Sequence, residues 1–284
     1  MSTKFAVGDW RGEFRASEYL IDAIYQRGLT IIDVGKYNSV MARLSYRAED
    51  MYIPLKDWYQ KRTNRRLSAA IIQAPQEGIS LARLAQLCCD GNEGAAAQKI
   101  QFLESESLVE STGPAAWRCT KELDNFGPTF TKIVAETLYH DLAIPTLWDV
   151  KIGGVKENDY DVLGLSEGRL IYVECKSSTT APSQTEVNHF LRRVEEISPM
   201  MAILLLDGDG AARGAAEAAD AVIEWDQHLQ FDRLPSDYGD AYVGLGQIYI
   251  AGTGRRIETA LRRCIQHYYQ QMWRRRQVPT DDVV

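Results

Sequence analysis

The chain has 284 residues, 45% of them hydrophobic, and can bury the core of one large domain or of two modest ones. Its net charge of −7, from 32 basic and 39 acidic residues, argues against a protein that coats nucleic acid by bulk electrostatics. The sequence contains neither a run of about 18 apolar residues nor a signal-peptide pattern. We therefore expect a cytoplasmic protein without a membrane partner.

Residues 1–60 combine three short apolar segments, FAVGDW, LTIIDVG and DMYIPL, with one amphipathic stretch, ASEYLIDAIYQRG. The stretch ends at Gly28, as a helix with a glycine C-cap would. The pattern predicts a small α+β N-terminal segment, and it contains no chemical motif.

Residues 61–121 have helical character, in the segments NRRLSAAIIQA, ISLARLAQLC and GAAAQKIQFLESESLV, followed by a turn at Gly113 and Pro114 within ESTGPAAWRCT. Three helices and a hairpin in about 60 residues are typical of a winged helix-turn-helix. Ser80 is the expected N-cap of the second helix. The predicted small core consists of Ile79, Leu84, Leu87, Ile100, Leu103 and Leu108.

The third helix of a winged helix can enter the major groove of DNA. Here that helix, residues 92–107, offers Lys99 and Gln98 against three glutamates, whereas phosphate contacts need several basic side chains. We therefore favour a connector or dimerisation element over a module that reads sequence.

Residues 124–278 alternate between helical and strand-like segments with glycine-rich punctuation, which predicts an α/β domain with a mixed sheet. The expected order is helix PTFTKIVAETLYHDL, strand TLWDVKIG, hairpin DYDVLGL and LIYVECK, helix SQTEVNHFLRRVEEI, strand MAILLLD, helix AARGAAEAA, strands AVIEW and QIYIAGTG, and a long helix from Arg255 to about Arg276.

The hairpin segment YDVLGLSEGRLIYVECKSS places charged residues at the ends of two apolar strands. In LIYVECK, the period of two puts Glu174 and Lys176 on one face of the strand. Asp161 begins the preceding strand, and the SEGR turn is long enough to set the two strands side by side. Asp161, Glu174 and Lys176 can therefore meet at one end of a two-stranded ribbon.

Two carboxylates in a partly dry site are unfavourable unless a positive charge lies between them. A hard divalent ion such as Mg²⁺ prefers such oxygen ligands. Lys176 could hold or deprotonate an attacking water, or stabilise the charge that develops on a phosphate. The pattern thus indicates phosphodiester hydrolysis. An exposed cross-strand ion pair, worth less than about 1 kcal/mol, would not explain why three charges gather there.

The same residues resemble a known superfamily. Asp161 followed by Glu174-Cys175-Lys176, with Glu136 on the preceding helix, resembles the PD-(D/E)xK nucleases and their restriction-endonuclease-like fold. GGVKENDYDVLGLSEGRLIYVECKSS is similar in particular to the N-E-x-D-V…L…I-E-C-K signature of CRISPR-associated ancillary nucleases that cyclic oligoadenylate activates. The likeness covers about residues 126–225, and a winged helix ahead of the nuclease matches the order of modules in that family.

The resemblance implies a role for each matching residue. Asp161, Glu174 and the backbone carbonyl of Cys175 would be ligands of Mg²⁺ or Mn²⁺, Lys176 the catalytic lysine, and Glu136 a helix-borne acid near the metal. Tyr160 stands where the superfamily often has proline. The resemblance also implies a nucleotide activator, although 120 residues before the nuclease are too few for both a winged helix and a complete ligand-sensing domain.

Several basic or polar residues are candidate contacts for nucleic acid. In the resembled fold, the helix after the catalytic strand faces the scissile phosphate, so Gln184 and Arg192 are candidates, with a solvated helix surface as the alternative. Arg255 and Arg256 begin the terminal helix after the glycine loop AGTGRR, where a phosphate could lie at a helix N-terminus. An equally good interpretation is that these residues form a solvated helix face or a face that packs against a second copy of the chain.

The remaining reactive side chains carry little signal. The five cysteines are scattered, without C-x-x-C or zinc-ligand spacing, so we expect reduced thiols in the core. The four histidines are isolated, and only His140, one turn after Glu136, merits a test.

These observations lead to a first hypothesis of a divalent-metal-dependent endonuclease, acting on DNA more than on RNA, in antiviral defence or nucleic-acid processing. The resemblance and the need to cut two strands favour a homodimer. The alternative is a non-catalytic winged-helix protein that binds nucleic acid and keeps a nuclease scaffold.

Overall fold

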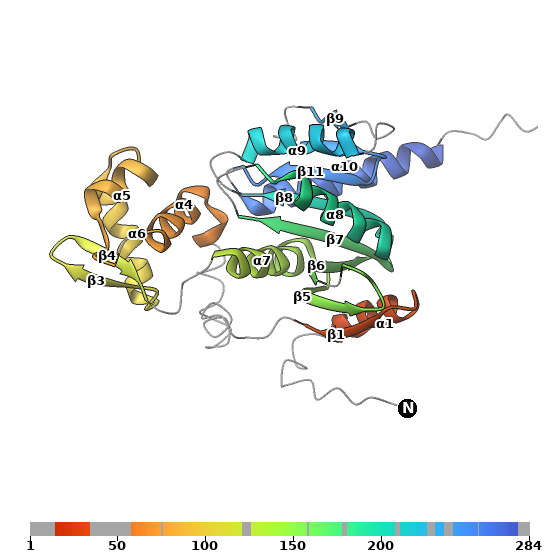
Figure 1. The fold of residues 1–284 in the computed structure, drawn as a ribbon, viewed down its shortest axis with the longest axis horizontal. Coiled ribbons are helices and arrows are strands. Elements are labelled where there is room, and N and C mark those ends of the chain that lie inside the picture. The colour runs from red at the N-terminus through yellow and green to blue at the C-terminus, as the bar shows by residue number, and fades with distance from the viewer. Residues whose placement is uncertain are drawn as a thin grey trace, which may run out of the picture.

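The computed structural model describes residues 15–34, 58–74, 76–120, 126–157, 159–177, 181–207, 211–225, 231–235, 241–254 and 256–277. These residues form a large α/β body around an eight-stranded sheet and a smaller helical module with a three-stranded sheet (Figure 1). The large body agrees with the expectation of a mixed sheet flanked by helices.

The smaller module contains the three helices and the hairpin expected from the sequence. Its elements are α4 (Arg62–Ile72), β2 (Ile79–Ser80), α5 (Leu81–Cys88), α6 (Glu93–Ser105), β3 (Val109–Gly113) and β4 (Ala116–Cys119), with strand order β2-β4-β3. Ser80 caps α5 as expected, because its side chain accepts a hydrogen bond from the Arg83 amide at 3.3 Å. Leu84, Ile100, Leu103 and Leu108 are fully buried. The element order is that of a winged helix, and membership of that class stays a prediction.

The large sheet has the strand order β1-β5-β6-β7-β8-β11-β10-β9. Strands β7, β8 and β11 run parallel to one another, and the other neighbours pair antiparallel. The strands are β1 (Thr30–Asp33), β5 (Thr146–Gly153), β6 (Asp159–Ser166), β7 (Arg169–Lys176), β8 (Met201–Leu206), β9 (Phe231–Arg233), β10 (Ala241–Gly244) and β11 (Ile248–Gly252).

Helices cover both faces of this sheet. Helices α1 (Arg15–Tyr25), α8 (Gln184–Ile197) and α9 (Ala211–Trp225) pack on the face that carries Leu170 and Tyr172. Helices α7 (Phe126–Glu136) and α10 (Ile257–Gln277) pack on the face that carries Ile171 and Val173. The alternation expected for β7 is therefore confirmed, since its successive residues enter opposite cores.

The N-terminal elements differ from the expectation of a segment of their own. Strand β1 pairs antiparallel with β5 and forms one edge of the large sheet. Leu20 and Ile24 of α1 are fully buried in the same core as residues of α8. A four-residue strand and one helix have too little apolar surface for a core of their own, so they extend the larger one. The segments FAVGDW and DMYIPL lie outside the described residues.

The segment AVIEW was expected to be a strand, and this prediction is wrong. It forms the end of α9, because Ala215, Ala218, Ala219 and Val222 continue the helical spacing and are buried together. Two short strands that the sequence did not indicate, β9 and β10, instead complete the sheet beyond β11.

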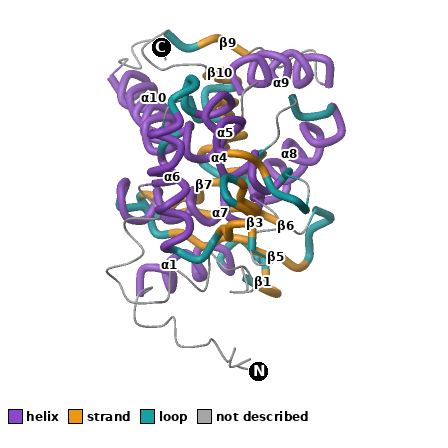
Figure 2. Tube along the Cα trace, turned by 90° about the vertical axis from the view of Figure 1, so that its left-hand side faces the viewer, coloured by secondary structure: helices purple, strands orange, loops and turns teal. Residues whose placement is uncertain are grey.

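The smaller module is anchored at the carboxyl ends of the parallel strands (Figures 1 and 2). Arg65 of α4 reaches Asp207, which directly follows β8, with 2.8 Å between Nε and Oδ2. The Gln60 side chain donates to Thr137 at 2.7 Å and accepts from the Glu258 amide at 2.9 Å. Polar contacts of α4 and of Gln60 just before it therefore hold this part of the chain against three parts of the large body.

None of the described helices combines the length and the apolar character that crossing a membrane requires. All five cysteines are free thiols; Cys88 and Cys264 are buried, as expected, whereas Cys89, Cys119 and Cys175 are only partly buried.

Candidate active site

The β6–β7 hairpin brings the predicted residues to one end of the sheet. Ser166 pairs with Arg169, and the two residues between them, Glu167 and Gly168, have φ values of +51° and +74°. Two left-handed residues form the tight turn whose twist suits adjacent antiparallel strands. The ladder runs back to the pair Val162 and Val173, so the next residues toward the open end, Asp161 and Glu174, lie across from each other.

At Asp161, the regular backbone pairing of β6 with both of its neighbouring strands is interrupted. The β5–β6 register places Asp149 opposite Asp161, and Asp149 has a φ of +50°, which interrupts regular strand geometry. The Asp161 Oδ2 atom accepts a hydrogen bond from the Cys175 amide at 2.7 Å. A side-chain carboxylate thus takes a hydrogen bond from the neighbouring strand and is fixed beside Glu174.

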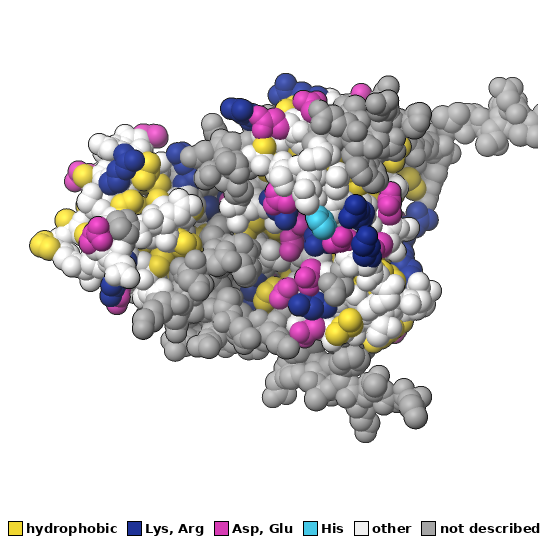
Figure 3. All heavy atoms as spheres, viewed as in Figure 1, with side chains coloured by type: hydrophobic (Ala, Val, Ile, Leu, Met, Phe, Trp, Pro, Cys, Tyr) yellow, Lys and Arg dark blue, Asp and Glu magenta, His cyan; other side chains and the backbone are white. Residues whose placement is uncertain are grey.

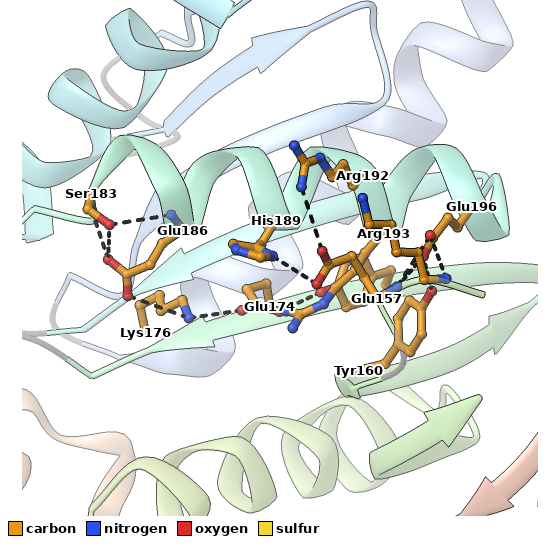
Figure 4. Close-up of polar contacts among 12 residues, drawn as sticks. Glu157, Tyr160, Glu174, Lys176, Ser183, Glu186, His189, Arg192, Arg193 and Glu196 are labelled. Atoms are coloured by element: carbon orange, nitrogen blue, oxygen red, sulfur yellow. Dashed lines mark hydrogen bonds and ion pairs between the residues drawn. The ribbon is translucent and has the colours of Figure 1, made fainter. Parts of the chain in front are cut away.

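Glu174 is 2% exposed, and both of its carboxylate oxygens have partners (Figure 4). Its Oε1 lies 3.0 Å from Lys176 Nζ. Its Oε2 lies 2.7 Å from the Arg193 guanidinium and also accepts the Tyr172 hydroxyl. Glu174 and Lys176 project to the same face, as the sequence predicted.

Helix α8 supplies the other charges of this site. It begins with a capping box, in which Ser183 and Glu186 exchange hydrogen bonds with each other's backbone amides. The same Glu186 carboxylate lies 3.7 Å from Lys176 Nζ. Because Glu186 and Arg193 are two helical turns apart, both face β7. Lys176 therefore sits between two carboxylates, one on its own strand and one on α8.

The residues that precede β6 are also held by α8 (Figure 4). The Glu196 carboxylate accepts the Lys156 amide at 2.9 Å and the Tyr160 hydroxyl at 3.3 Å. The Glu157 carboxylate lies 2.8 Å from His189 Nδ1. The entry into β6, and hence the place of Asp161, is fixed from the same helix that contacts Glu174.

Burial, and then the charge of Glu174, raise the pKa of Asp161 to about 7, although the Cys175 amide acts in the opposite direction. For Lys176, burial disfavours the charged form, but the nearby Glu174, Asp161 and Glu186 outweigh it and raise the pKa. Lys176 therefore stays protonated at neutral pH in the metal-free site. It is better suited to stabilise negative charge than to deprotonate water.

The donor set fits a hard divalent ion. Mg²⁺ and Mn²⁺ accept one or two carboxylates and complete their coordination with water and phosphate oxygens. Asp161 and Glu174 are close enough for one charge to affect the other, and a cation between them would remove that repulsion. Within the described ranges, no three acidic, histidine or cysteine side chains form a complete ligand cluster. The residues thus fit an ion shared with substrate and water.

Glu136 is not joined to these residues. Its Oε2 lies 3.1 Å from His140 Nε2, in the five-residue π-helix Thr137–Asp141 that follows α7. Among the described contacts, none connects Glu136 with Asp161, Glu174 or Lys176. Helix α7 packs on the face of the sheet opposite α8. The role of Glu136 as an acid near the metal stays a prediction.

The predicted nucleic-acid contacts lie at two places. Gln184 is the first residue of α8 and donates to Asn188 at 3.0 Å, and Arg192 lies 3.8 Å from Glu157. Arg256 lies 3.8 Å from Glu258, and Arg255 is outside the described residues. On the face seen in Figure 3, basic and acidic side chains are intermingled. The binding role of these four residues stays a prediction.

Sequence reasoning missed Arg193, Tyr172 and Glu186, all of which contact Glu174 or Lys176. Arg193 follows Arg192 in LRRVEEI, and only Arg192 of the two was a candidate contact. A usable signal was present, because Glu186 and Arg193 are seven residues apart on a helix that follows the charged strand.

The Asp161→Asn variant is expected to be as stable as the metal-free wild type at pH 4, and more stable at pH 8 by about 4 kcal/mol. The folded-state pKa of Asp161 is raised above its unfolded value near 4. Its stabilising contribution is therefore complete below about pH 4 and is lost as the pH rises through about 7. Asparagine carries no charge and keeps an oxygen for the Cys175 amide. Urea unfolding in EDTA at both pH values measures the difference.

The matched control is Asp159→Asn, two residues earlier on the same strand. Asp159 is 60% exposed and pairs with Lys151 at 3.5 Å, so its removal should not change the pH dependence. If the free energy of unfolding of wild type changed with pH between 4 and 8 in the same way as that of Asp161→Asn, the repulsion inferred at this site would be contradicted.

Comparisons with known proteins give little support for a family. No family model and no curated protein matches the chain. Among solved structures, protein VC1899 from Vibrio cholerae is similar with a TM-score of 0.46 and 12% identity, over 89% of this chain and 61% of that one. Can2 from Sulfobacillus thermosulfidooxidans, solved in complex with cyclic tetra-adenylate, is similar with a TM-score of 0.37 and 14% identity, over 72% of this chain and 60% of that one.

The chain therefore spans about three fifths of the length of each of these two structures. At TM-scores this low, neither likeness carries an argument about function. The functional proposal rests on the geometry of the site and on the motif in the sequence.

Proposed function

We propose that the chain is a divalent-metal-dependent nuclease that hydrolyses phosphodiester bonds, with a site of the PD-(D/E)xK type. The observation that carries the proposal is the convergence of Asp161, Glu174 and Lys176 at the end of one hairpin, with Glu174 buried and Lys176 kept protonated by its neighbours. A surface ion pair would need neither the burial nor the second carboxylate.

Each residue has a role in this proposal. Asp161, Glu174 and the Cys175 carbonyl would hold Mg²⁺ or Mn²⁺, which supplies Lewis-acid stabilisation of a phosphate oxygen and lowers the pKa of bound water. Lys176, as a protonated amine, stabilises the negative charge that develops on the phosphate. Glu136 would be a further acid near the metal, as the resemblance implies.

The sequence motif supports the narrower parts of the proposal. It favours a DNA endonuclease in antiviral, CRISPR-type defence, acting as a homodimer, with a nucleotide activator as an additional partner. Gln184, Arg192, Arg255 and Arg256 are the proposed contacts for the nucleic-acid backbone.

Incubation of the purified protein with plasmid, single-stranded DNA and RNA tests this function. We expect cleavage with Mg²⁺ or Mn²⁺ and none with EDTA, because the two acids hold the required ion. A parallel series with cyclic oligoadenylates tests the activator. Equal degradation in metal and in EDTA, or no cleavage of any substrate in any of these conditions, would contradict the proposal.

The alternative is a winged-helix protein that binds nucleic acid without cutting it. Helix α6 gives it little support, since Lys99 is the only basic residue among Glu93–Ser105 and its amine contacts Thr63 at 2.8 Å. Binding without metal-dependent cleavage would favour this alternative.

A further inference from the structure

The two oxygens of the Glu174 carboxylate have very different surroundings. Oε1 faces Lys176, whose side chain is 27% exposed and ends in a single flexible amine. Oε2 faces Arg193 and Tyr172, and these side chains are 15% exposed and fully buried respectively. One oxygen is therefore open to exchange of partners, and the other is enclosed.

The enclosed side is rigidly built. The Tyr172 ring packs against Tyr160 and Phe190, with ring centroids 5.4 Å and 5.7 Å apart. Arg193 lies on α8, whose Glu196 binds the Tyr160 hydroxyl. Neither partner of Oε2 can move without disturbing the core between β6, β7 and α8.

The guanidinium of Arg193 is only partly satisfied by hydrogen bonds: Nη1 donates to Glu174, but Nε has no partner among the described residues. Its Nε is buried, and a buried donor without a partner is unfavourable. Burial also disfavours its charge, yet the nearby Glu174 outweighs this and raises the pKa of Arg193. The contact with Glu174 is thus the interaction that holds Arg193 in place.

We propose that Arg193, whose contact with Glu174 is drawn in Figure 4, acts together with Tyr172 as a positioning residue that fixes Oε2 of Glu174, so that Oε1 is presented beside Asp161 to a divalent cation. The inference rests on the proposed function. Hydrogen-bonded partners of a metal-binding carboxylate set its orientation, and their loss commonly weakens metal binding about 10- to 100-fold.

Two effects of Arg193 oppose each other. Its positive charge repels an incoming cation, but it is paired with Oε2 of Glu174 at 2.7 Å, which leaves Oε1 for the cation. Without Arg193, the buried Glu174 carboxylate would lose the charged partner that fixes Oε2, so its oxygens would no longer be held in one orientation toward the cation. We therefore expect loss of Arg193 to weaken metal binding.

Binding of Mn²⁺ to the intact chain, without nucleic acid, tests the proposal through the electron paramagnetic resonance signal of free Mn²⁺. Arg193→Lys, Arg193→Met and Tyr172→Phe are each expected to bind Mn²⁺ about tenfold more weakly than wild type. Arg193→Lys keeps the charge and loses the planar fork, and Tyr172→Phe changes no charge. Together they separate the effect of Glu174 orientation from the effect of the Arg193 charge. Circular dichroism verifies that each variant is folded.

The matched control is Arg262→Met on α10. Arg262 pairs with Glu258 at 2.7 Å on the opposite side of the sheet, and its loss should leave Mn²⁺ affinity unchanged. If folded Arg193→Lys and Tyr172→Phe bind Mn²⁺ as wild type does, or if Arg193→Met binds it more tightly, the positioning role is overturned while the metal site stands. If wild type itself binds no Mn²⁺, the metal site and this proposal both fail.

Discussion

The Lys176→Met variant is expected to cleave nucleic acid about 100- to 1,000-fold more slowly than wild type, while it binds nucleic acid within about threefold of wild type. Lys176 lies 3.0 Å from Glu174 on the more exposed side of that carboxylate, and its raised pKa keeps it protonated at neutral pH. Removal of one preorganised charge that stabilises a developing anion typically costs this much in rate. Binding depends on many backbone contacts and should change little.

The variant should remain folded. Glu174 keeps Arg193 and the Tyr172 hydroxyl when Lys176 is replaced, so its buried charge is still compensated. Cleavage rates in Mg²⁺, together with fluorescence anisotropy of a labelled oligonucleotide in Ca²⁺, measure the two quantities separately.

Lys151→Met is the control for this variant. Lys151 also pairs with a carboxylate, Asp159, at 3.5 Å, but it is half-exposed on β5 and away from Glu174. Its replacement should leave the cleavage rate within about twofold of wild type. Equal rates for Lys176→Met and wild type would remove the catalytic assignment, and would favour a nuclease scaffold that only binds nucleic acid.

The strand pattern was sufficient to predict the three residues of the candidate site that converge. The period of two in LIYVECK is a property of extended backbone, so Glu174 and Lys176 had to share a face once β7 formed. The SEGR turn then brought Asp161 alongside through local contacts alone. These are short-range relations, and the sequence contains them directly.

Long-range contacts could not be predicted in this way. Arg65 and Asp207 are 142 residues apart, and nothing in either segment indicates the other. Arg193 and Glu174 are 19 residues apart, but their contact depends on how α8 is rotated against β7. AVIEW was misassigned because its β-branched residues favour strands, whereas the alanine spacing before it continues a helix into the same core.

Replacement of Arg65 by methionine is expected to lower the free energy of unfolding by about 3 to 5 kcal/mol, which is the usual cost of breaking a buried ion pair from one side. Arg65 is 2% exposed. Its guanidinium donates to Asp207 at 2.8 Å, to the Tyr59 and Gln60 carbonyls at 2.7 and 2.6 Å, and to the Thr253 hydroxyl at 3.1 Å. The variant would remove the charge partner of the buried Asp207 carboxylate, which keeps only the Thr253 hydroxyl, and the donor of two buried carbonyls.

The loss should also reach the candidate site. Asp207 donates its backbone amide to the Lys176 carbonyl at 2.8 Å, so Arg65 supports the residue that borders the end of β7. Urea unfolding followed by circular dichroism gives the free energy. The double variant Arg65→Met/Asp207→Leu should be more stable than Arg65→Met alone, because it removes the unpaired carboxylate as well.

An exposed ion pair of the same module provides the comparison. Arg118 lies 2.7 Å from Glu110, and the two side chains are 48% and 50% exposed. Arg118→Met should therefore cost less than about 1 kcal/mol, since water compensates for the lost partner. If Arg65→Met cost as little as Arg118→Met, Asp207 would have to be solvated or protonated in the folded protein, and α4 would not be anchored to the sheet through this pair.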